Sequence, residues 1–173
     1  MSEIVWQGRF LSAVREGTWE YAARNGGVSA AVIVAVHEGD LILVEQMRIP
    51  IERRCLELPA GLVGDEEAGE AIADAARREL EEETGFLAER VELLGDFQSS
   101  PGMTSEDFTL VRATGLTRTG PGGGEANEDI AVHLVPLGEL TTFVVAKRAA
   151  GVAIDAKLLA VLGPALLGGL AGA

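Results

Sequence analysis

The clearest hydrophobic pattern along the chain is a run of β-branched and small apolar residues at 28–37, which predicts a buried strand. A turn at 38–40 leads into a second apolar run, at 41–44, so these two runs are expected to form a hairpin. Upstream, alternating apolar and polar residues predict another hairpin, with strands over 9–14 and 18–22. Three further strands are expected near 91–97, 108–113 and 130–135.

The hydrophobic period changes from strand to helix at 66–84, where Leu80 lies on the apolar side of a strongly charged segment. Gly85 supplies the stop signal for this helix. A short helix is expected after Pro136, and a final one over 154–162. Strands on both sides of a central helix favour a layered α+β domain.

Length and charge limit the function classes. The chain has 173 residues, enough for one globular domain, and its 14 Lys and Arg against 27 Asp and Glu give a formal charge of −13. This charge argues against nucleic-acid binding, because phosphate backbones are held by basic side chains. One cysteine and two histidines exclude a disulfide framework and a Cys/His zinc site. With neither a signal peptide nor an apolar span recognised, a cytoplasmic protein without a membrane partner is expected.

Three acidic residues in the predicted helix suggest metal chemistry. Glu79, Glu82 and Glu83 are spaced i, i+3, i+4, so their side chains converge on one face. Like charges at this spacing repel, and a bound divalent cation would relieve the repulsion. Oxygen ligands without Cys or His favour a hard ion such as Mg²⁺ or Mn²⁺. The alternative is a solvated acidic surface.

The wider spacing around these acids resembles the signature of the Nudix hydrolase family, carried by Gly64, Glu70, Arg78, Glu79, Leu80, Glu82, Glu83, Gly85 and Phe86. The resemblance implies an α/β/α sandwich with a mixed central sheet and Mg²⁺ as cofactor, with Mn²⁺ as a substitute. It implies metal ligation by Glu79, Glu82 and Glu83, with Glu82 also counted as catalytic. It implies that Arg78 orients a glutamate. Residues 1–26 would form an N-terminal β-hairpin extension, and 27–173 the Nudix domain.

The segment from Glu57 to Gly61 resembles the E-x-P-A-G motif of nucleotide-sugar members of the family. The resemblance makes the backbone carbonyl of Ala60 a metal ligand and Glu57 a substrate-binding residue. In the family this motif ends on the first signature glycine. Here three extra residues intervene, so either Gly61 or Gly64 can take that place.

Several shorter pieces resemble the ADP-ribose pyrophosphatase branch. The resemblance assigns Arg48 to the substrate diphosphate, with a surface arginine as the alternative. Trp19 would stack on adenine from a hairpin shared within a homodimer, although it could instead be buried core. The substrate-binding residues expected in all are Trp19, Glu20, Arg24, Arg48, Glu57, Pro101 and Gly102.

The general base of this branch is a glutamate on a loop after the signature. The segment 124–130 resembles that loop, which makes Glu128 the first candidate, Glu125 the second and Glu106 a distant third. Glycines at 122–124 would let the loop close over substrate.

The function implied is metal-dependent hydrolysis of the diphosphate of ADP-ribose, or of a related nucleoside diphosphate sugar, to a nucleoside monophosphate and a sugar phosphate. Two alternatives stay open. One is a Nudix hydrolase of another substrate, such as GDP-mannose, a dinucleotide or an oxidised nucleotide. The other is a nucleotide-binding module that keeps the fold without turnover.

Overall fold

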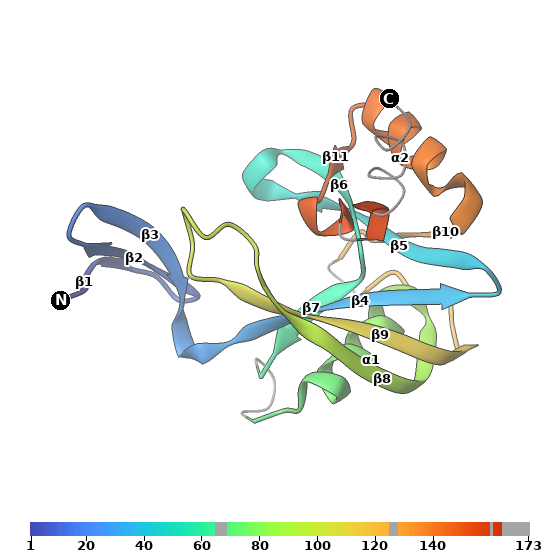
Figure 1. The fold of residues 1–173 in the computed structure, drawn as a ribbon, viewed down its shortest axis with the longest axis horizontal. Helices are drawn as coiled ribbons and strands as arrows, with labels where there is room; N and C mark the ends of the chain where they lie inside the picture. The colour runs from blue at the N-terminus through green and yellow to red at the C-terminus, as the bar shows by residue number, and fades with distance from the viewer. Residues whose placement is uncertain (65–68, 125–127, 160, 164–173) are drawn as a thin grey trace.

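A computed structural model of the protein describes residues 1–64, 69–124, 128–159 and 161–163. These residues form a three-stranded sheet and an eight-stranded sheet. Figure 1 shows the small sheet projecting from one end of the larger body. In the described residues, no helix is long and apolar enough to cross a membrane.

The larger sheet contains β4 (Ser29–His37), β5 (Asp40–Arg48), β6 (Arg53–Glu57), β7 (Ala60–Val63), β8 (Phe86–Gln98), β9 (Asp107–Arg118), β10 (Ala131–Pro136) and β11 (Ala153–Ile154). Its main order is β11-β6-β5-β4-β9-β8, with β10 paired to β5 and β7 paired to β4. The β4–β9 and β11–β6 pairs are parallel and the others are antiparallel, so the predicted mixed sheet is confirmed.

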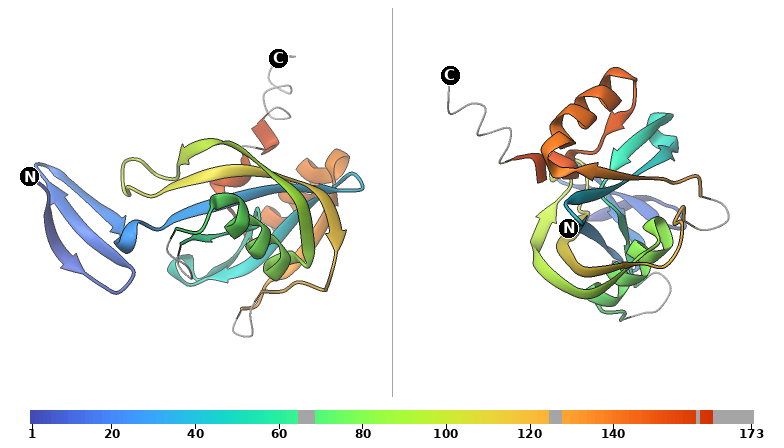
Figure 2. Two further views of the ribbon diagram at one scale, coloured as in Figure 1. Left: turned by 90° about the horizontal axis from the view of Figure 1, so that it is seen from below. Right: turned by 90° about the vertical axis from the view of Figure 1, so that its right-hand side faces the viewer.

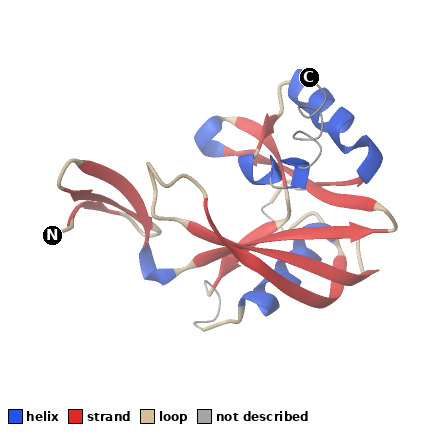
Figure 3. Ribbon diagram, viewed as in Figure 1, coloured by secondary structure: helices blue, strands red, loops and turns tan. Residues whose placement is uncertain are grey.

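Two helices cover opposite faces of this sheet (Figures 2 and 3): α1 (Ile72–Thr84) and α2 (Leu140–Ala149). Alternate residues of β4 belong to different cores, as the period of a strand requires. Ile33 joins the core that contains Leu80 of α1, whereas Val32 joins the core that contains Leu140 of α2. The α/β/α architecture is therefore confirmed.

The N-terminal extension has one strand more than expected. The predicted hairpin is present as β2 (Leu11–Glu16) and β3 (Trp19–Arg24), and β1 (Glu3–Gln7) adds to its edge. All five residues of β1 are exposed, so no buried face gives this strand a detectable pattern. The sheet is attached to the body through Ala22, which exchanges backbone hydrogen bonds with Met103 and Ser105. The division of the chain at residue 26 stays a prediction.

The central helix begins later than its hydrophobic period suggests. Its first helical residue is Ile72, whereas helix was expected from residue 66. Gly69 has a φ of +89°, which a right-handed helix does not accommodate. Residues 65–68 lie outside the described part of the chain. As predicted, the helix ends at Gly85, whose φ is +74° and whose N–H donates to the carbonyl of Glu81.

The remaining differences from the predicted elements concern the C-terminal segment and the strands. The expected helix over 154–162 is wrong at its start, because Ile154 belongs to β11 and pairs with Leu56 of β6. Asp155 then accepts a hydrogen bond from the backbone of Lys157 and caps a short 3₁₀ turn, η4 (Ala156–Leu158). The other 3₁₀ turns are η1 (Asn25–Gly27), η2 (Ile49–Ile51) and η3 (Leu137–Glu139). Strands β6 and β7 were not expected, and β8 and β9 are longer than predicted.

Candidate active site

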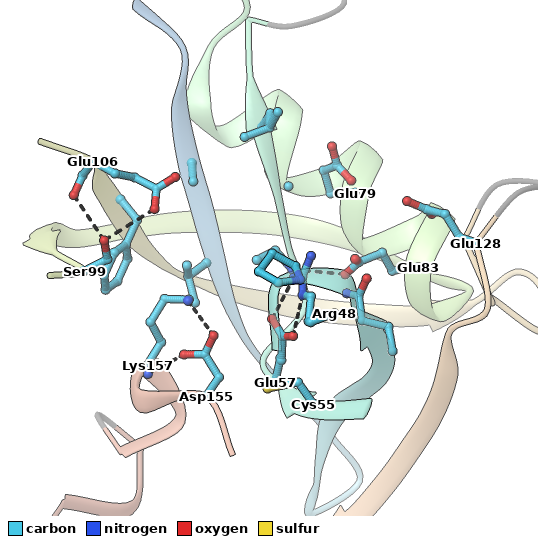
Figure 4. A pocket seen from close by; sticks show the side chains of 18 of the residues that line it. Arg48, Cys55, Glu57, Glu79, Glu83, Ser99, Glu106, Glu128, Asp155 and Lys157 are labelled. Carbon is cyan, nitrogen blue, oxygen red and sulfur yellow. Dashed lines mark hydrogen bonds and ion pairs between the residues drawn. The ribbon is translucent and has the colours of Figure 1, made fainter. Parts of the chain in front are cut away.

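A cavity of about 610 Å³ lies where the end of α1 meets β4 to β7 (Figure 4). The structure brings eight of the predicted site residues to its wall: Arg24, Arg48, Glu57, Ala60, Glu79, Glu83, Glu106 and Glu128. They come from segments far apart in the sequence. Folding therefore gathers acids and arginines that were assigned separately.

Glu83 is the most deeply buried acid of the α1 cluster, with only 6% of the residue exposed. Its Oε2 accepts a hydrogen bond of 3.0 Å from the backbone N–H of Ala60. Burial, reinforced by the negative charges of Glu79 and Glu128, raises the pKa of Glu83 to about 8 despite this hydrogen bond. Three carboxylates thus influence one another across the same end of the cavity (Figure 4).

Arg78 lies beside this cluster and contacts two glutamates of the same helix and one that precedes it. Its Nη1 donates to Glu79 at 3.0 Å and to Glu82 at 3.3 Å, and its Nε donates to Glu70 at 3.3 Å. A guanidinium in this position can hold carboxylates in fixed orientations. Arg78 and Glu82 do not line the cavity, whereas Glu79 and Glu83 of the same helix do.

The carboxylates fit a hard divalent cation by their chemistry. The side chains of Glu79, Glu83 and Glu128 at this end of the cavity offer oxygen, and burial with the neighbouring negative charges raises the pKa of Glu83, an effect that a bound cation would oppose. Within the described ranges, however, no three Asp, Glu, His or Cys side chains stand close enough to form a ready-made metal site. A bound ion would therefore require these side chains to move closer together.

The two glycines that compete for the first signature position have separate structural roles. A Cβ on Gly61 would lie 1.8 Å from the carboxyl carbon of Glu79, so a larger residue here would force that side chain to move. Gly64 has a φ of +82° and ends β7, and its N–H lies 3.5 Å from an oxygen of Glu70. The close contact with Glu79 therefore falls on Gly61, whereas the positive φ of the turn falls on Gly64.

The glycine segment 122–124 is docked on the end of α1. The N–H of Gly123 donates to the carbonyl of Glu83 at 2.8 Å, and the N–H of Gly124 donates to the carbonyl of Glu82 at 3.0 Å. These bonds satisfy carbonyls that the end of a helix leaves without an intrahelical partner. A Cβ on Gly122 would lie 2.4 Å from the backbone of Thr84. The loop glycines were expected to give flexibility, and the structure adds a second role in close packing.

Arg48 and Glu57 form a two-pronged ion pair inside the cavity, with both N···O distances 2.7 Å. Glu57 is 3% exposed, whereas the Arg48 side chain is 45% exposed. The hydrogen bonds to Glu57 raise the pKa of Arg48, so its positive charge is permanent. Arg48 is not an isolated surface arginine, because a buried carboxylate fixes its guanidinium at the cavity wall.

One wall of the cavity was missed from the sequence. Asp155 and Lys157 follow β11 and pair at 2.6 Å, and Cys55 of β6 lies close by. The N-cap position of Asp155 was a usable signal, but a continuous helix was expected there. Burial raises the pKa of the Cys55 thiol to about 12, which keeps it protonated and a poor nucleophile.

The opposite end of the cavity joins the body to the N-terminal sheet. Arg24 pairs with Glu106 at 2.6 Å, and the Ser99 hydroxyl lies 3.4 Å from an oxygen of the same carboxylate. Glu106, the third candidate for the general base, is therefore engaged with Arg24 away from the carboxylates of α1 (Figure 4).

Trp19, Pro101 and Gly102 meet in a second cavity of about 360 Å³ between the N-terminal sheet and the loop before β9. Trp19 is 62% exposed, so the alternative that it belongs to the core is wrong for this chain. Glu20 lies exposed on β3 and lines neither cavity. Glu125, the second candidate base, lies outside the described residues.

Comparison with known proteins places the chain in a family. The model of the NUDIX domain matches residues 27–162. The chain belongs to the Nudix family. A crystal structure of an ADP compounds hydrolase shares the fold with a TM-score of 0.71, covering 97% of this chain and 92% of the other at 23% sequence identity. The matched region thus includes every described acid and arginine discussed above except Glu20 and Arg24.

Named proteins with similar sequences align with different fractions of this Nudix chain. A methanol dehydrogenase activator of Bacillus methanolicus is 40% identical over 63% of this chain and 57% of its own length. An ADP-ribose pyrophosphatase of Bacillus subtilis is 42% identical over 45% of this chain and 40% of its own. The chain therefore spans about half the length of these two relatives. An ADP-sugar pyrophosphatase of mouse is 35% identical over 83% of this chain and 71% of its own.

Proposed function

We propose that this protein hydrolyses the diphosphate of ADP-ribose, or of a related nucleoside diphosphate sugar, to a nucleoside monophosphate and a sugar phosphate. The observation that carries the proposal is the cavity in which Glu79, Glu83 and Glu128 stand at one end and the Arg48–Glu57 pair stands beside them. Relatives named ADP-ribose pyrophosphatase and ADP-sugar pyrophosphatase support the substrate class.

Mg²⁺, with Mn²⁺ as a substitute, is the proposed cofactor. Glu79, Glu82, Glu83 and the carbonyl of Ala60 would hold it, and when bound it would neutralise charge on the diphosphate and acidify water. This cation also resolves the electrostatic difficulty of an acidic chain that acts on an anion, because the formal charge of −13 would otherwise repel the substrate.

The protein's own residues supply binding and proton transfer. The Arg48 guanidinium would hold diphosphate oxygens, since its pair with Glu57 involves Nε and Nη2 and leaves Nη1 outside that pair. The Glu128 carboxylate would take a proton from the attacking water as the new P–O bond forms and the bridging P–O bond breaks. Each product then carries one phosphate.

The test is a turnover panel of ADP-ribose, GDP-mannose, UDP-glucose, NADH and a deoxynucleoside triphosphate, each with Mg²⁺ and with Mn²⁺. We expect the highest kcat/KM with ADP-ribose or another nucleoside diphosphate sugar, and AMP among the products of ADP-ribose. Preference for the dinucleotide or the triphosphate would overturn the substrate class. No cleavage of any compound would favour the nucleotide-binding module instead.

We also propose a cytoplasmic homodimer in which the N-terminal sheet contributes to the partner's substrate pocket. Large apolar side chains are exposed on this sheet, which buries little by itself: Ile4, Val5, Trp6, Phe10 and Trp19. Pairing with a second copy would cover them in a closed two-fold assembly. Light scattering of the full chain measures the mass that decides this point.

Replacing Trp19 by Ala should raise KM for adenine-containing substrates about tenfold, because stacking on a base contributes ~1–3 kcal/mol. Thermal stability should stay near that of the wild type, since Trp19 is 62% exposed. Steady-state kinetics and a melting curve measure the two effects. Trp6→Ala is the matched control, as Trp6 is exposed on the same sheet and lines neither cavity. An equal rise of KM in both variants would assign the effect to the sheet rather than to stacking by Trp19.

A further inference from the structure

A charged network lies on the face of the β5–β6 ladder opposite the cavity. Side chains alternate along paired strands, so Arg48 and Glu57 face the cavity while Glu45 and Arg54 face the other way. Glu45 is buried, with its side chain 9% exposed, and it pairs with Lys147 of α2 at 2.5 Å. Its other oxygen accepts from Arg54 at 2.8 Å.

Arg54 is held rigidly within this network. Its Nη2 donates to the backbone carbonyl of Glu45 at 2.7 Å while its Nε bonds to the side chain of the same residue. Hydrogen bonds from Lys147, Arg54 and His133 outweigh the effect of burial and lower the pKa of Glu45, so this anchor keeps its charge. A guanidinium fixed on one edge presents its remaining donors in a set direction.

Those remaining donors reach Asp129. The Nη1 of Arg54 donates to the Asp129 carboxylate at 2.7 Å, and its Nη2 lies 3.2 Å from the Asp129 backbone carbonyl. The Asp129 side chain is 86% exposed, so burial does not fix it in place. The contact therefore attaches the segment at Glu128 to the β5–β6 ladder through the side chain and the backbone together.

We propose that Arg54 and Asp129 are positioning residues that hold Glu128 at the cavity. The inference rests on the proposed function, in which the Glu128 carboxylate accepts the proton of the attacking water. Asp129 directly follows Glu128, and its two bonds to Arg54 restrict the backbone from which the Glu128 side chain projects. A small displacement of a catalytic group lowers the rate steeply, so this restraint contributes to kcat rather than to substrate binding.

Replacing Asp129 by Ala should lower kcat about tenfold, with KM changed less than about twofold and the melting temperature unaltered. Arg54→Lys should act in the same direction, because an ammonium keeps the charge beside Glu45 but cannot bridge both partners. The matched control is Glu92→Ala. It removes another exposed carboxylate paired with an arginine, Arg112 on the β8–β9 ladder, and kcat should stay at the wild-type value.

The decisive readout is the double variant Asp129→Ala/Glu128→Gln. If Asp129 acts through Glu128, this variant should have the kcat of Glu128→Gln alone, whereas multiplied effects would overturn the proposal.

Hydrogen exchange of the backbone at 128–130 gives a second readout without substrate. Exchange should be faster in Asp129→Ala and unchanged in Glu92→Ala. Equal exchange in all three proteins would overturn the positioning role. If the wild type were inactive across the substrate panel, the proposed function would be refuted. The exchange measurement would still decide whether Asp129 restrains the backbone at Glu128.

Discussion

Replacing Glu83 by Gln should lower kcat by about 10²- to 10⁴-fold and leave the fold intact. Glu83 is the most buried acid of the cluster and is electrostatically coupled to Glu79 and Glu128. The amide oxygen of Gln can still accept the hydrogen bond from Ala60, so the change removes charge rather than packing. Steady-state kinetics with the best substrate of the panel measure the loss.

The same substitution has a pH signature in the metal-free protein. The folded-state pKa of Glu83 is about 8, against an ordinary value of 4.5. Between these two values the folded state holds a proton that the unfolded state has released, so stability falls as pH rises through this window. Melting temperatures in a chelator at pH 5, 7 and 9 should therefore decrease more steeply for the wild type than for Glu83→Gln. Added Mg²⁺ should stabilise the wild type and have less effect on the variant.

Glu81→Gln is the control, because Glu81 lies on the same helix but its side chain is exposed and absent from the cavity. It should retain the kinetics and the pH dependence of the wild type. Near-normal kcat in Glu83→Gln would refute the assignment of the α1 carboxylates to the reaction.

Replacing Arg48 by Ala should affect stability and activity together. Loss of the guanidinium leaves Glu57, which is 3% exposed, as a buried carboxylate without its ion-pair partner, at a cost of about 2–3 kcal/mol in the free energy of unfolding. It also removes the proposed contact to the diphosphate, so kcat/KM should fall about 100-fold or more. Urea denaturation and initial rates measure the two effects.

The double variant Arg48→Ala/Glu57→Gln separates these effects. Neutralising Glu57 removes the unpaired charge, so the double variant should regain much of the lost stability. Activity should stay low, because the guanidinium is still absent. Recovery of kcat/KM along with stability would show that Arg48 serves the fold alone and would refute its role in substrate binding.

The elements predicted best are those with a strong, unbroken pattern. The β-branched run of β4 and the helical period around Leu80 were sufficient to place the central strand and α1, because both elements contribute apolar side chains to the buried cores. Strand β1 was missed for the opposite reason, as all its residues are exposed. The predicted start of α1 was too early. Acidic residues at 66–70 continue the charged pattern of the helix, but the positive φ of Gly69 is incompatible with helical geometry.

The predicted site depended on chemistry that is local in sequence. The signature placed Glu79 and Glu83 on one helix, and the structure places both at the cavity. Lys157 could not be predicted to line the same cavity as Arg48, because its position depends on β11 adding to the edge of β6, and two residues of strand carry no recognisable pattern. For the same reason the contact of Arg54 with Asp129 has no signature in the sequence, since it joins positions brought together only by the sheet.

The bonds from Gly123 and Gly124 to the last turn of α1 run entirely between main-chain atoms. Their donors are present in every amino acid except proline, so a scan that truncates side chains would not detect this connection. The carbonyls that accept these bonds belong to Glu83 and Glu82, the residues whose side chains carry the proposed metal site. The backbone that carries these carboxylates is therefore joined directly to the glycine segment at 123–124, and movement in either would be transmitted to the other.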